Sequence, residues 1–224
     1  MKAMILAAGR GERMRPLTDV QPKPLLQVGG KPLLAHHLHK LAEQGIEQVV
    51  INHAWLGEQI EQEFGSGERF GVSISYSAEP AGGLETAGGI IRALPLLGEQ
   101  PFWLINGDIF TEFPFAEFPR ELPQETDMHL LLVSNPAHNA SGDFSLQGDQ
   151  LVAPEAVTYT YSGMALIHPR LFANYQAGAE YFLPLRPFIE QAIAQHRAMG
   201  SVIGQPWTDV GTPQRLQQLR EVHD

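Results

Sequence analysis

A glycine-rich loop that follows the first apolar run of the chain could hold a phosphate group. Gly9 and Gly11 stand at alternate positions, which lets the backbone pass close to a ligand and present its N–H groups to phosphate oxygens. Arg13 and Lys23 could add positive charge to the same polyphosphate, the arginine as a fork and the lysine as a point charge. Two competing motifs are excluded, because a dinucleotide fingerprint needs a small residue where Met14 stands and a Walker P-loop needs Gly-Lys-Ser/Thr. A tight turn between a strand and a loop would also explain the two glycines.

Two aspartates that precede turns could hold a divalent metal ion. Asp108 ends the segment Asn106-Gly107-Asp108, and Asp209 begins the segment Asp209-Val210-Gly211-Thr212. A carboxylate at the carboxyl edge of a parallel sheet lies where open α/β folds bind ligands. Two such carboxylates could share Mg²⁺, a hard ion that takes oxygen ligands and bridges phosphates. Taken singly, each aspartate is also explained as a turn or cap residue.

Short apolar runs with helical stretches between them must position these side chains. Apolar runs of four to eight residues are typical of buried strands, and apolar residues at spacings of three and four are typical of helices. The predicted strands are 3–8, 48–52, 72–76, 102–106, 129–134, 143–147 and 158–167. The predicted helices span or contain 34–41, 58–64, 87–94, 185–196 and 213–222, the last with Thr212 as its cap.

The order of these elements predicts the class of fold. Strands and helices alternate in the first half, which indicates parallel β-α-β units with right-handed crossovers, whereas the second half is less regular. No internal repeat, heptad array or low-complexity linker divides the chain. We therefore expect an α/β fold with a mostly parallel sheet flanked by helices, in a single domain of residues 1–224.

The charges are unevenly distributed along the chain. The formal net charge is −10, yet residues 1–31 carry +4 and no lysine follows Lys40. A basic segment in an acidic chain suggests an anion site near its N-terminal end. The acidic balance argues against non-specific nucleic-acid binding, and no apolar run reaches the roughly 18–20 residues of a membrane span. The absence of cysteine excludes thiol catalysis and disulfides and fits a reducing cytoplasm, which is the expected location.

Four segments together resemble the sugar-1-phosphate nucleotidylyltransferases, over essentially the whole chain. They are Leu6-Ala7-Ala8-Gly9-x-Gly11-x-Arg13-Met14, Pro22-Lys23-Pro24, Asn106-Gly107-Asp108 and Asp209-Val210-Gly211-Thr212. A further segment, Leu84-Glu85-Thr86-Ala87-Gly88-Gly89, is similar to that family's Leu-Gly-Thr-Ala-Gly segment, which lines the nucleobase pocket. The resemblance implies a Rossmann-like sheet of the nucleotide-diphospho-sugar transferase type.

The resemblance also implies roles for residues of this chain. Arg13 and Lys23 would be catalytic, with Lys23 on the α-phosphate. The nucleotide would contact Gly11, Glu12, Arg13, Lys23, Glu79 and Gly83, the sugar would contact Asn106, Asp143 and Gly163, and the Mg²⁺ cofactor would contact Asp108 and Asp209. A carboxylate at position 79 can accept the N3–H of uracil or the N–H groups of guanine, so it leaves the nucleotide open. An exposed loop acid remains the alternative for Glu79, and a turn at a strand end remains the alternative for Asp143 and Gly163.

One feature departs from the pattern of the family. Many relatives use a second lysine, in the later half of the chain, to hold the sugar phosphate, and this chain has none there. Either the metal and backbone N–H groups take over that contact, or an arginine does. Arg170, Arg186 and Arg197 are available, but none lies in a matching motif.

The implied reaction joins a nucleoside triphosphate to a sugar 1-phosphate and releases pyrophosphate. A sugar 1-phosphate is largely dianionic at neutral pH, because the second pKa of its phosphate group is about 6. The reaction therefore needs no general base and no catalytic histidine. Positioning and electrostatic stabilisation would supply the catalysis. The preferred substrates are UTP and N-acetylmuramate 1-phosphate, in peptidoglycan recycling.

Two alternatives stay open at this point. The first is a family member that uses glucose, N-acetylglucosamine or mannose 1-phosphate with dTTP, UTP or GTP. The second is a nucleotide-sensing domain that keeps the fold and lacks turnover. In either case the expected partners are small molecules, with no nucleic acid and no membrane. The sequence leaves the oligomeric state open, with a monomer as one possibility.

Overall fold

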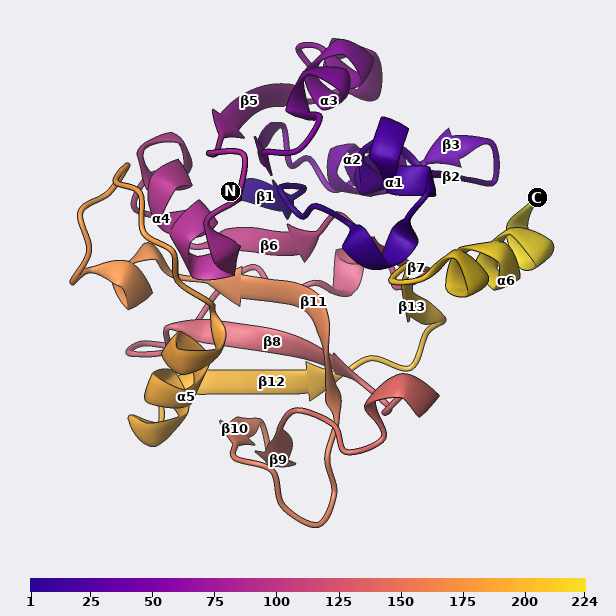
Figure 1. Cartoon of the computed structure of the whole chain (residues 1–224). Coiled ribbons are helices and arrows are strands. Elements are labelled where there is room, and N and C mark those ends of the chain that lie inside the picture. The colour runs from indigo at the N-terminus through magenta and orange to yellow at the C-terminus, as the bar shows by residue number, and fades with distance from the viewer.

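A nine-stranded sheet forms the centre of the computed structural model, which describes residues 1–224 (Figure 1). Its strands lie in the order β5 (Ser73–Ala78), β4 (Gln48–His53), β1 (Lys2–Leu6), β6 (Phe102–Asn106), β11 (Thr160–Ile167), β8 (Met128–Val133), β12 (Ala198–Val202), β10 (Gln150–Val152) and β9 (Ser145–Gln147). The strands predicted from the apolar runs are therefore all present in this one sheet.

The first half of the sheet is parallel, as the alternation of strand and helix predicts. β5, β4, β1 and β6 are parallel neighbours. β1 pairs with β4 on one side and with β6 on the other. The strands that follow β1 are therefore added first on one side of it and then on the other, so the strand order reverses at β1. In open α/β sheets, ligands bind beyond the carboxyl ends of the strands at such a switch point. The loop that follows β1 is therefore at the expected binding position.

The second half of the sheet departs from the parallel pattern. β11 lies between β6 and β8 and is antiparallel to both, whereas β8 is parallel to β12. The sequence predicts a strand at 129–134, but the apolar run does not reveal that β11 separates it from β6. A continuous apolar run indicates a strand buried on both faces and carries no information about its neighbours or its direction.

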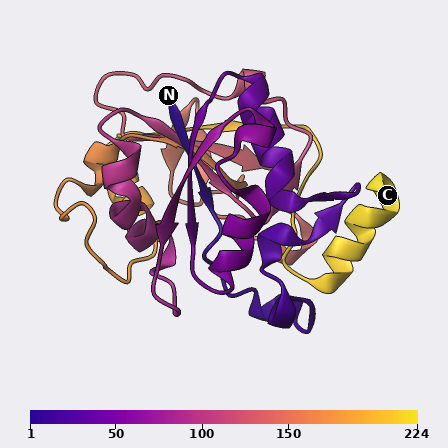
Figure 2. The same ribbon diagram turned by 90° about the horizontal axis from the view of Figure 1, so that it is seen from above.

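Helices cover both faces of the sheet, and Figure 2 shows them on the two sides of the strands. Alternate residues of one strand enter different cores: Ala3 and Ile5 of β1 join one cluster and Met4 joins the other. The first cluster takes in α2 and α3, and the second takes in α4 and α5. The helices are α1 (Leu17–Val20), α2 (Leu33–Glu43), α3 (Gly57–Phe64), α4 (Glu85–Leu97), α5 (Arg186–Ala194) and α6 (Pro213–His223).

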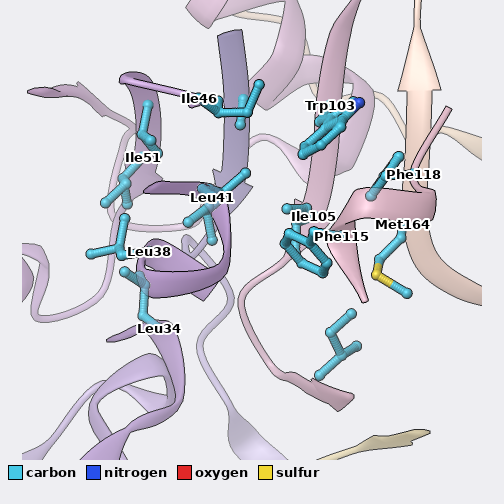
Figure 3. Packing of buried hydrophobic residues seen from close by; sticks show 14 of the residues in the cluster. Leu34, Leu38, Leu41, Ile46, Ile51, Trp103, Ile105, Phe115, Phe118 and Met164 are labelled. Carbon is cyan, nitrogen blue, oxygen red and sulfur yellow. The ribbon is translucent and has the colours of Figure 1, made fainter. Parts of the chain in front are cut away.

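The first cluster shows how helical periodicity becomes packing. Leu34, Leu38 and Leu41 of α2 are fully buried and lie on one face of the helix, together with the strand residues Ile51 and Ile105 (Figure 3). Burial of a leucine or isoleucine side chain contributes about 1.5–3 kcal/mol, so this face holds α2 firmly against β1, β4 and β6. The strand ends that carry the polar residues are thereby fixed in place.

Several element boundaries differ from the predicted ones. The strand predicted at 3–8 ends at Leu6, so Ala7 and Ala8 belong to the loop, and the helix predicted at 87–94 extends over Glu85–Leu97. The cap of the last helix is confirmed, because the side chain of Thr212 accepts a hydrogen bond from the N–H of Arg215. β12 was not predicted, since its sequence Ala-Met-Gly-Ser-Val is too small and polar to give an apolar run.

Two small ladders complete the fold. β2 (Gln27–Val28) pairs with β3 (Lys31–Pro32), and β7 (Ile109–Thr111) pairs with β13 (Trp207–Asp209), in both cases antiparallel. The second ladder joins the segment after β6 to the segment before α6, which lie far apart in the sequence. None of the helices has the length and apolar character needed to cross a bilayer.

Candidate active site

A cavity of about 530 Å³ opens at the carboxyl ends of β1, β4 and β6. Only 6 of its 22 lining residues are hydrophobic, so it suits a polar ligand better than an apolar one. It is lined by Leu6 to Met14 without a break, Lys23, Pro24, Asn52, Glu79, Gly82 to Thr86, Asn106, Asp108, Phe182 and Gly211. Eight of the predicted site residues lie in this lining: Gly11, Glu12, Arg13, Lys23, Glu79, Gly83, Asn106 and Asp108. Asp143, Gly163 and Asp209 lie outside it.

The loop after β1 is shaped by Gly11. Gly11 has φ +69°, and a Cβ atom there would come within 2.9 Å of the Thr18 side chain, so glycine is required twice over. The hydroxyl of Thr18 donates a hydrogen bond to the Gly11 carbonyl at 2.7 Å. A Cβ atom added to Gly9 would meet nothing within 4 Å, so the space beside this residue is free for a ligand. The loop is therefore pre-formed and still has room at its surface.

Arg10 of this loop is held by Trp55, a contact that the sequence did not predict. The guanidinium carbon lies 3.3 Å from the centre of the Trp55 ring, a cation–π stack. The indole N–H donates to the carbonyl of Thr18 at 3.0 Å. Trp55 therefore ties the glycine-rich loop to the segment after β4.

Lys23 and Asp108 form an ion pair at the cavity wall. The Nζ of Lys23 lies 2.5 Å from Oδ2 of Asp108, and the lysine side chain is only 10% exposed. Such a charge-assisted contact is strong, and a phosphate would have to compete with it. Sequence reasoning assigned both residues to the site, but the contact between them depends on the tertiary structure.

The β7–β13 ladder brings the two candidate metal-binding aspartates to one edge of the molecule. Asp209 pairs with Ile109, directly after Asp108, and the N–H of Val210 donates to the carbonyl of Asp108 at 2.8 Å. Oδ1 of Asp209 makes an ion pair with Arg215 and lies 2.9 Å from Nε2 of His138. No group of three or more His, Asp or Glu side chains is gathered tightly enough to form a metal site by itself.

Glu79 and Asn52 connect the loop after β1 to the loop before α4. Nδ2 of Asn52 donates to Oε1 of Glu79 at 2.6 Å, while Oδ1 of Asn52 accepts from the N–H of Ala7 at 2.9 Å. Oε2 of Glu79 accepts from the N–H of Leu84 at 2.9 Å. Burial raises the pKa of Glu79, and the hydrogen bonds from Asn52 and Leu84 act against that rise. Asn52 was missed by sequence reasoning, although it ends a predicted buried strand, as Asn106 does.

The predicted sugar residues lie in two places. A Cβ atom on Gly163, which has φ +82°, would come within 2.7 Å of the amide nitrogen of Asn106, so these two residues are in close contact. Asp143 lies further from the cavity, where its Oδ2 accepts from the N–H of Tyr161 at 2.9 Å. The guanidinium of Arg186 lies 3.8 Å from Oδ1 of Asp143 and stacks 4.6 Å from the centre of the Phe144 ring.

The other two arginines considered for the sugar phosphate form ion pairs with a buried aspartate. Arg170 and Arg197 both contact Oδ1 of Asp127 at 2.7 Å, and Asp127 is buried. A buried carboxylate needs such partners, because a charge that is buried without a partner is strongly destabilising. These arginines are therefore committed to Asp127, and Arg186 alone of the three lies near a predicted sugar residue.

His37 is the most deeply buried histidine and is chemically inert. Its Nε2 donates to the carbonyl of Ile109 at 3.0 Å, and burial lowers its pKa to about 3. It is therefore neutral at physiological pH, in a position to hold the backbone just after Asp108.

Comparisons with known proteins identify relatives of the chain. The family model for nucleotidyl transferases matches residues 2–142. The chain is 51% identical to the N-acetylmuramate alpha-1-phosphate uridylyltransferase of Neisseria meningitidis, over 98% of this chain and 97% of that protein. It is 35% identical to the protein of the same name from Caulobacter vibrioides, over 95% and 92% of the two chains. A crystal structure from Bacillus anthracis, described as a glucose-1-phosphate thymidylyltransferase, covers 100% of this chain and 95% of its own with a TM-score of 0.85 and 24% identity, which shows a shared fold.

Proposed function

The chain belongs to the nucleotidyl transferase family, and from that premise we propose that it joins UTP to N-acetylmuramate α-1-phosphate, with release of pyrophosphate. The product is UDP-N-acetylmuramate, a sugar nucleotide of peptidoglycan recycling. The observation that carries this proposal is the 51% identity, over 98% of the chain, to a relative that bears the name of this activity. The cavity supports it with a polar lining that contains most of the predicted site residues.

The triphosphate lies on the loop after β1. Backbone N–H groups around Gly11 and Glu12 face its oxygens, and Arg13 supplies charge from the exposed side of the loop. Lys23 turns from Asp108 to the α-phosphate when the nucleotide binds, since both acceptors lie at the same wall. Of the six basic residues in 1–31, Arg10, Arg13 and Lys23 line the cavity, where the four negative charges of the triphosphate arrive.

The base lies against the loop of Gly82 to Thr86. Gly83 lets the backbone approach the ring, and Glu79 has both carboxylate oxygens occupied by Asn52 and Leu84. Each oxygen keeps a further lone pair, so Glu79 can still accept the N3–H of uracil. Its hydrogen bonds to Asn52 and Leu84 hold it in place for that contact.

Asp108 and Asp209 hold Mg²⁺. They fit this ion because they offer carboxylate oxygens from neighbouring positions, Asp108 directly before β7 and Asp209 at the end of β13. Two carboxylates leave most of the coordination sphere to phosphate oxygens and water, as is usual for Mg²⁺. Held by Asp108 and Asp209, such an ion would supply positive charge that stabilises negative charge on the phosphates.

The sugar 1-phosphate lies beyond Asn106, towards Gly163 and Asp143. N-acetylmuramate differs from N-acetylglucosamine by a lactyl ether, which carries a carboxylate. Arg186 is the cation beside Asp143, and its side chain is 47% exposed on the ring of Phe144. We assign Arg186 to the lactyl carboxylate, because a guanidinium fork matches a carboxylate.

The reaction is a displacement at phosphorus. An oxygen of the sugar phosphate forms a bond to the α-phosphorus of UTP, the bond from that phosphorus to the bridging oxygen breaks, and pyrophosphate leaves with both electrons. Arg13 and Lys23 lower the barrier by stabilising charge on the phosphates, and the loop N–H groups fix their orientation. The nucleophile is already deprotonated, so no side chain accepts a proton.

Activity assays test the proposal directly. Four nucleoside triphosphates are combined with N-acetylmuramate, N-acetylglucosamine, glucose and mannose 1-phosphates, and pyrophosphate release is measured. We expect UTP with N-acetylmuramate 1-phosphate to rank first, and a tenfold preference for another pair would overturn the specificity. Absence of turnover with every pair, together with tight nucleotide binding, would favour the sensing domain.

Substitution of the two aspartates tests the metal assignment. We expect Asp108→Ala and Asp209→Ala each to lower turnover by at least ~10²-fold, as is typical for loss of a major electrostatic contributor. Circular dichroism and thermal unfolding would show that both variants keep the fold. Near-normal turnover in either variant would contradict the assignment.

Three further expectations depend on this function. The chain acts in the cytoplasm, where UTP is available, and it binds only small molecules as substrates. Residues 1–224 form a single domain and unfold in one transition, which calorimetry would test. A monomer is the expected state in solution, which light scattering would test.

A further inference from the structure

Arg215 of α6 makes the main contact with Asp209, and no feature of the sequence pointed to it. Its Nη1 forms an ion pair with Oδ1 of Asp209, and its side chain is only 15% exposed. Nε2 of His138 lies 2.9 Å from the same Oδ1, but His138 is 42% exposed. Both contacts therefore reach one carboxylate oxygen, from the helix side and from the solvent side.

The other oxygen of Asp209, Oδ2, has no hydrogen-bond donor. No side chain or backbone N–H donates a hydrogen bond to Oδ2. A Cβ atom on Gly211 would come within 3.0 Å of Oδ2, and Gly211 is a residue of the cavity wall. Oδ1 is thus anchored, whereas Oδ2 has no partner and lies close to Gly211 of the cavity wall.

The local structure holds Arg215 in this position. The hydroxyl of Thr212 accepts from the backbone N–H of Arg215 at 3.3 Å and from its Nε at 3.5 Å. The guanidinium also lies over Gly211, where a Cβ atom would collide with its Nη2. The helix cap and the missing side chain at position 211 together leave one place for this arginine.

The place of Arg215 in α6 is unfavourable for a cation. It is the third residue of the helix, and positive charge in the first turn opposes the helix macrodipole. α6 has no acidic residue in its first turn to offset that opposition. Asp209, just before the helix, is the partner that compensates.

We propose that Arg215 is a positioning residue for Asp209. Its guanidinium fixes Oδ1 of the aspartate, so that Oδ2 is presented to the metal ion. The inference rests on the proposed function, in which Asp209 binds Mg²⁺. Carboxylates that bind metals are commonly oriented by hydrogen bonds from neighbouring groups, and loss of such a partner typically costs 10–100-fold in metal affinity or activity. Nε2 of His138 lies 2.9 Å from Nη1 of Arg215 as well as from Oδ1 of Asp209, on the exposed side, where a contact is worth little.

Metal binding without turnover tests the proposal. Mn²⁺ serves as the probe, and free Mn²⁺ is measured by electron paramagnetic resonance in solutions of the full chain with UTP and no sugar phosphate. We expect Arg215→Met to weaken Mn²⁺ binding by roughly 10–100-fold, whereas His138→Ala changes it by less than about threefold. Gly211→Ala should weaken Mn²⁺ binding in the same direction as Arg215→Met, because the added methyl displaces the guanidinium.

Two controls separate positioning from helix anchoring. Arg220→Ala removes a cation from the same helix, where its Nε donates to the carbonyl of Gln27, and it should leave Mn²⁺ binding unchanged. In an Asp209→Asn background, Arg215→Met should have no further effect on Mn²⁺ affinity, because the arginine acts through the carboxylate. Thermal unfolding of each variant shows how much stability is lost.

Three outcomes would overturn the positioning role of Arg215. Unchanged or tighter Mn²⁺ binding in Arg215→Met, beside normal binding in the wild type, would overturn the positioning role and leave Arg215 as an anchor of α6 or a competitor of the metal. An equal loss in Arg220→Ala would also overturn it. Failure of the wild-type chain to bind Mn²⁺ with UTP would overturn the metal assignment itself, and the positioning role with it.

Discussion

Asn52→Asp is a substitution of nearly identical shape with a large expected effect. Asn52 is 2% exposed, and its two side-chain atoms have different partners: Oδ1 accepts from the N–H of Ala7, and Nδ2 donates to Glu79. An aspartate keeps the first contact. It replaces the second with a carboxylate oxygen that faces Oε1 of Glu79, in a position where the asparagine donor is 2.6 Å away.

The expected cost depends on pH. Loss of a hydrogen bond to a charged group removes about 1.5–3 kcal/mol, and two charges 4 Å apart repel by about 4 kcal/mol at an effective dielectric constant near 20. The two carboxylates avoid part of this repulsion when one of them binds a proton. Each unit by which the carboxyl pKa is raised in the folded state corresponds to about 1.4 kcal/mol. Burial already raises the pKa of Glu79, and a second carboxylate raises it further.

The direction of the pH effect follows from linkage. A carboxyl group whose pKa is higher in the folded than in the unfolded state contributes stability at acid pH, and that stability is lost as the pH rises through the folded-state pKa. We therefore expect Asn52→Asp to cost below about 1 kcal/mol at pH 5 and about 3–5 kcal/mol at pH 8. For a chain of this size, the second figure corresponds to a decrease in Tm of roughly 6–20 °C.

Thermal unfolding followed by circular dichroism between pH 5 and pH 8.5 measures this effect. Asn52→Ala is the matched control, because it loses both hydrogen bonds and adds no charge, so its deficit should vary much less with pH. UTP titrations of the same variants would show whether the bridge also supports the nucleotide site. A deficit for Asn52→Asp that stays constant across the pH range, or that matches the deficit of Asn52→Ala, would refute the reasoning.

Three further predictions concern single residues. Arg186→Ala should raise the KM for N-acetylmuramate 1-phosphate roughly tenfold, the value of one charge-assisted contact, with the KM for UTP unchanged; an equal rise with N-acetylglucosamine 1-phosphate would instead assign Arg186 to the phosphate. Gly163→Ala should cost at least about 1–2 kcal/mol of stability, because alanine resists a φ of +82°, and it should raise the KM for the sugar phosphate by displacing Asn106; a wild-type Tm and KM would contradict the contact. Since the pKa of His37 falls to about 3, the unfolded chain binds a proton below about pH 6.5 that the folded chain does not, so stability should fall by about 1.4 kcal/mol per pH unit on acidification from this group. His37→Asn should show a shallower acid slope in denaturant unfolding, and identical slopes would argue against a neutral buried histidine.

The sequence alone was sufficient for most strands of the central sheet and for the local motifs. The first five predicted strands all form, because a run of apolar residues with turns at its ends specifies burial regardless of its neighbours. The glycine-rich loop and Lys23 were identifiable for the same reason, since the φ of Gly11 and the charge of Lys23 are properties of single positions. The concentration of positive charge in residues 1–31 needed no structure at all.

The tertiary structure decided which of these residues meet. The ladder of β7 and β13 brings Asp209 next to Asp108, and Asn52 joins Glu79 and Ala7 across two strands. The tertiary structure also gives the later arginines different partners. Arg170 contacts the buried Asp127, Arg186 lies near Asp143, and Arg215 contacts Oδ1 of Asp209. Strand order and side-chain partners depend on contacts between segments far apart in the chain, and a local pattern of apolar and polar residues carries no record of them.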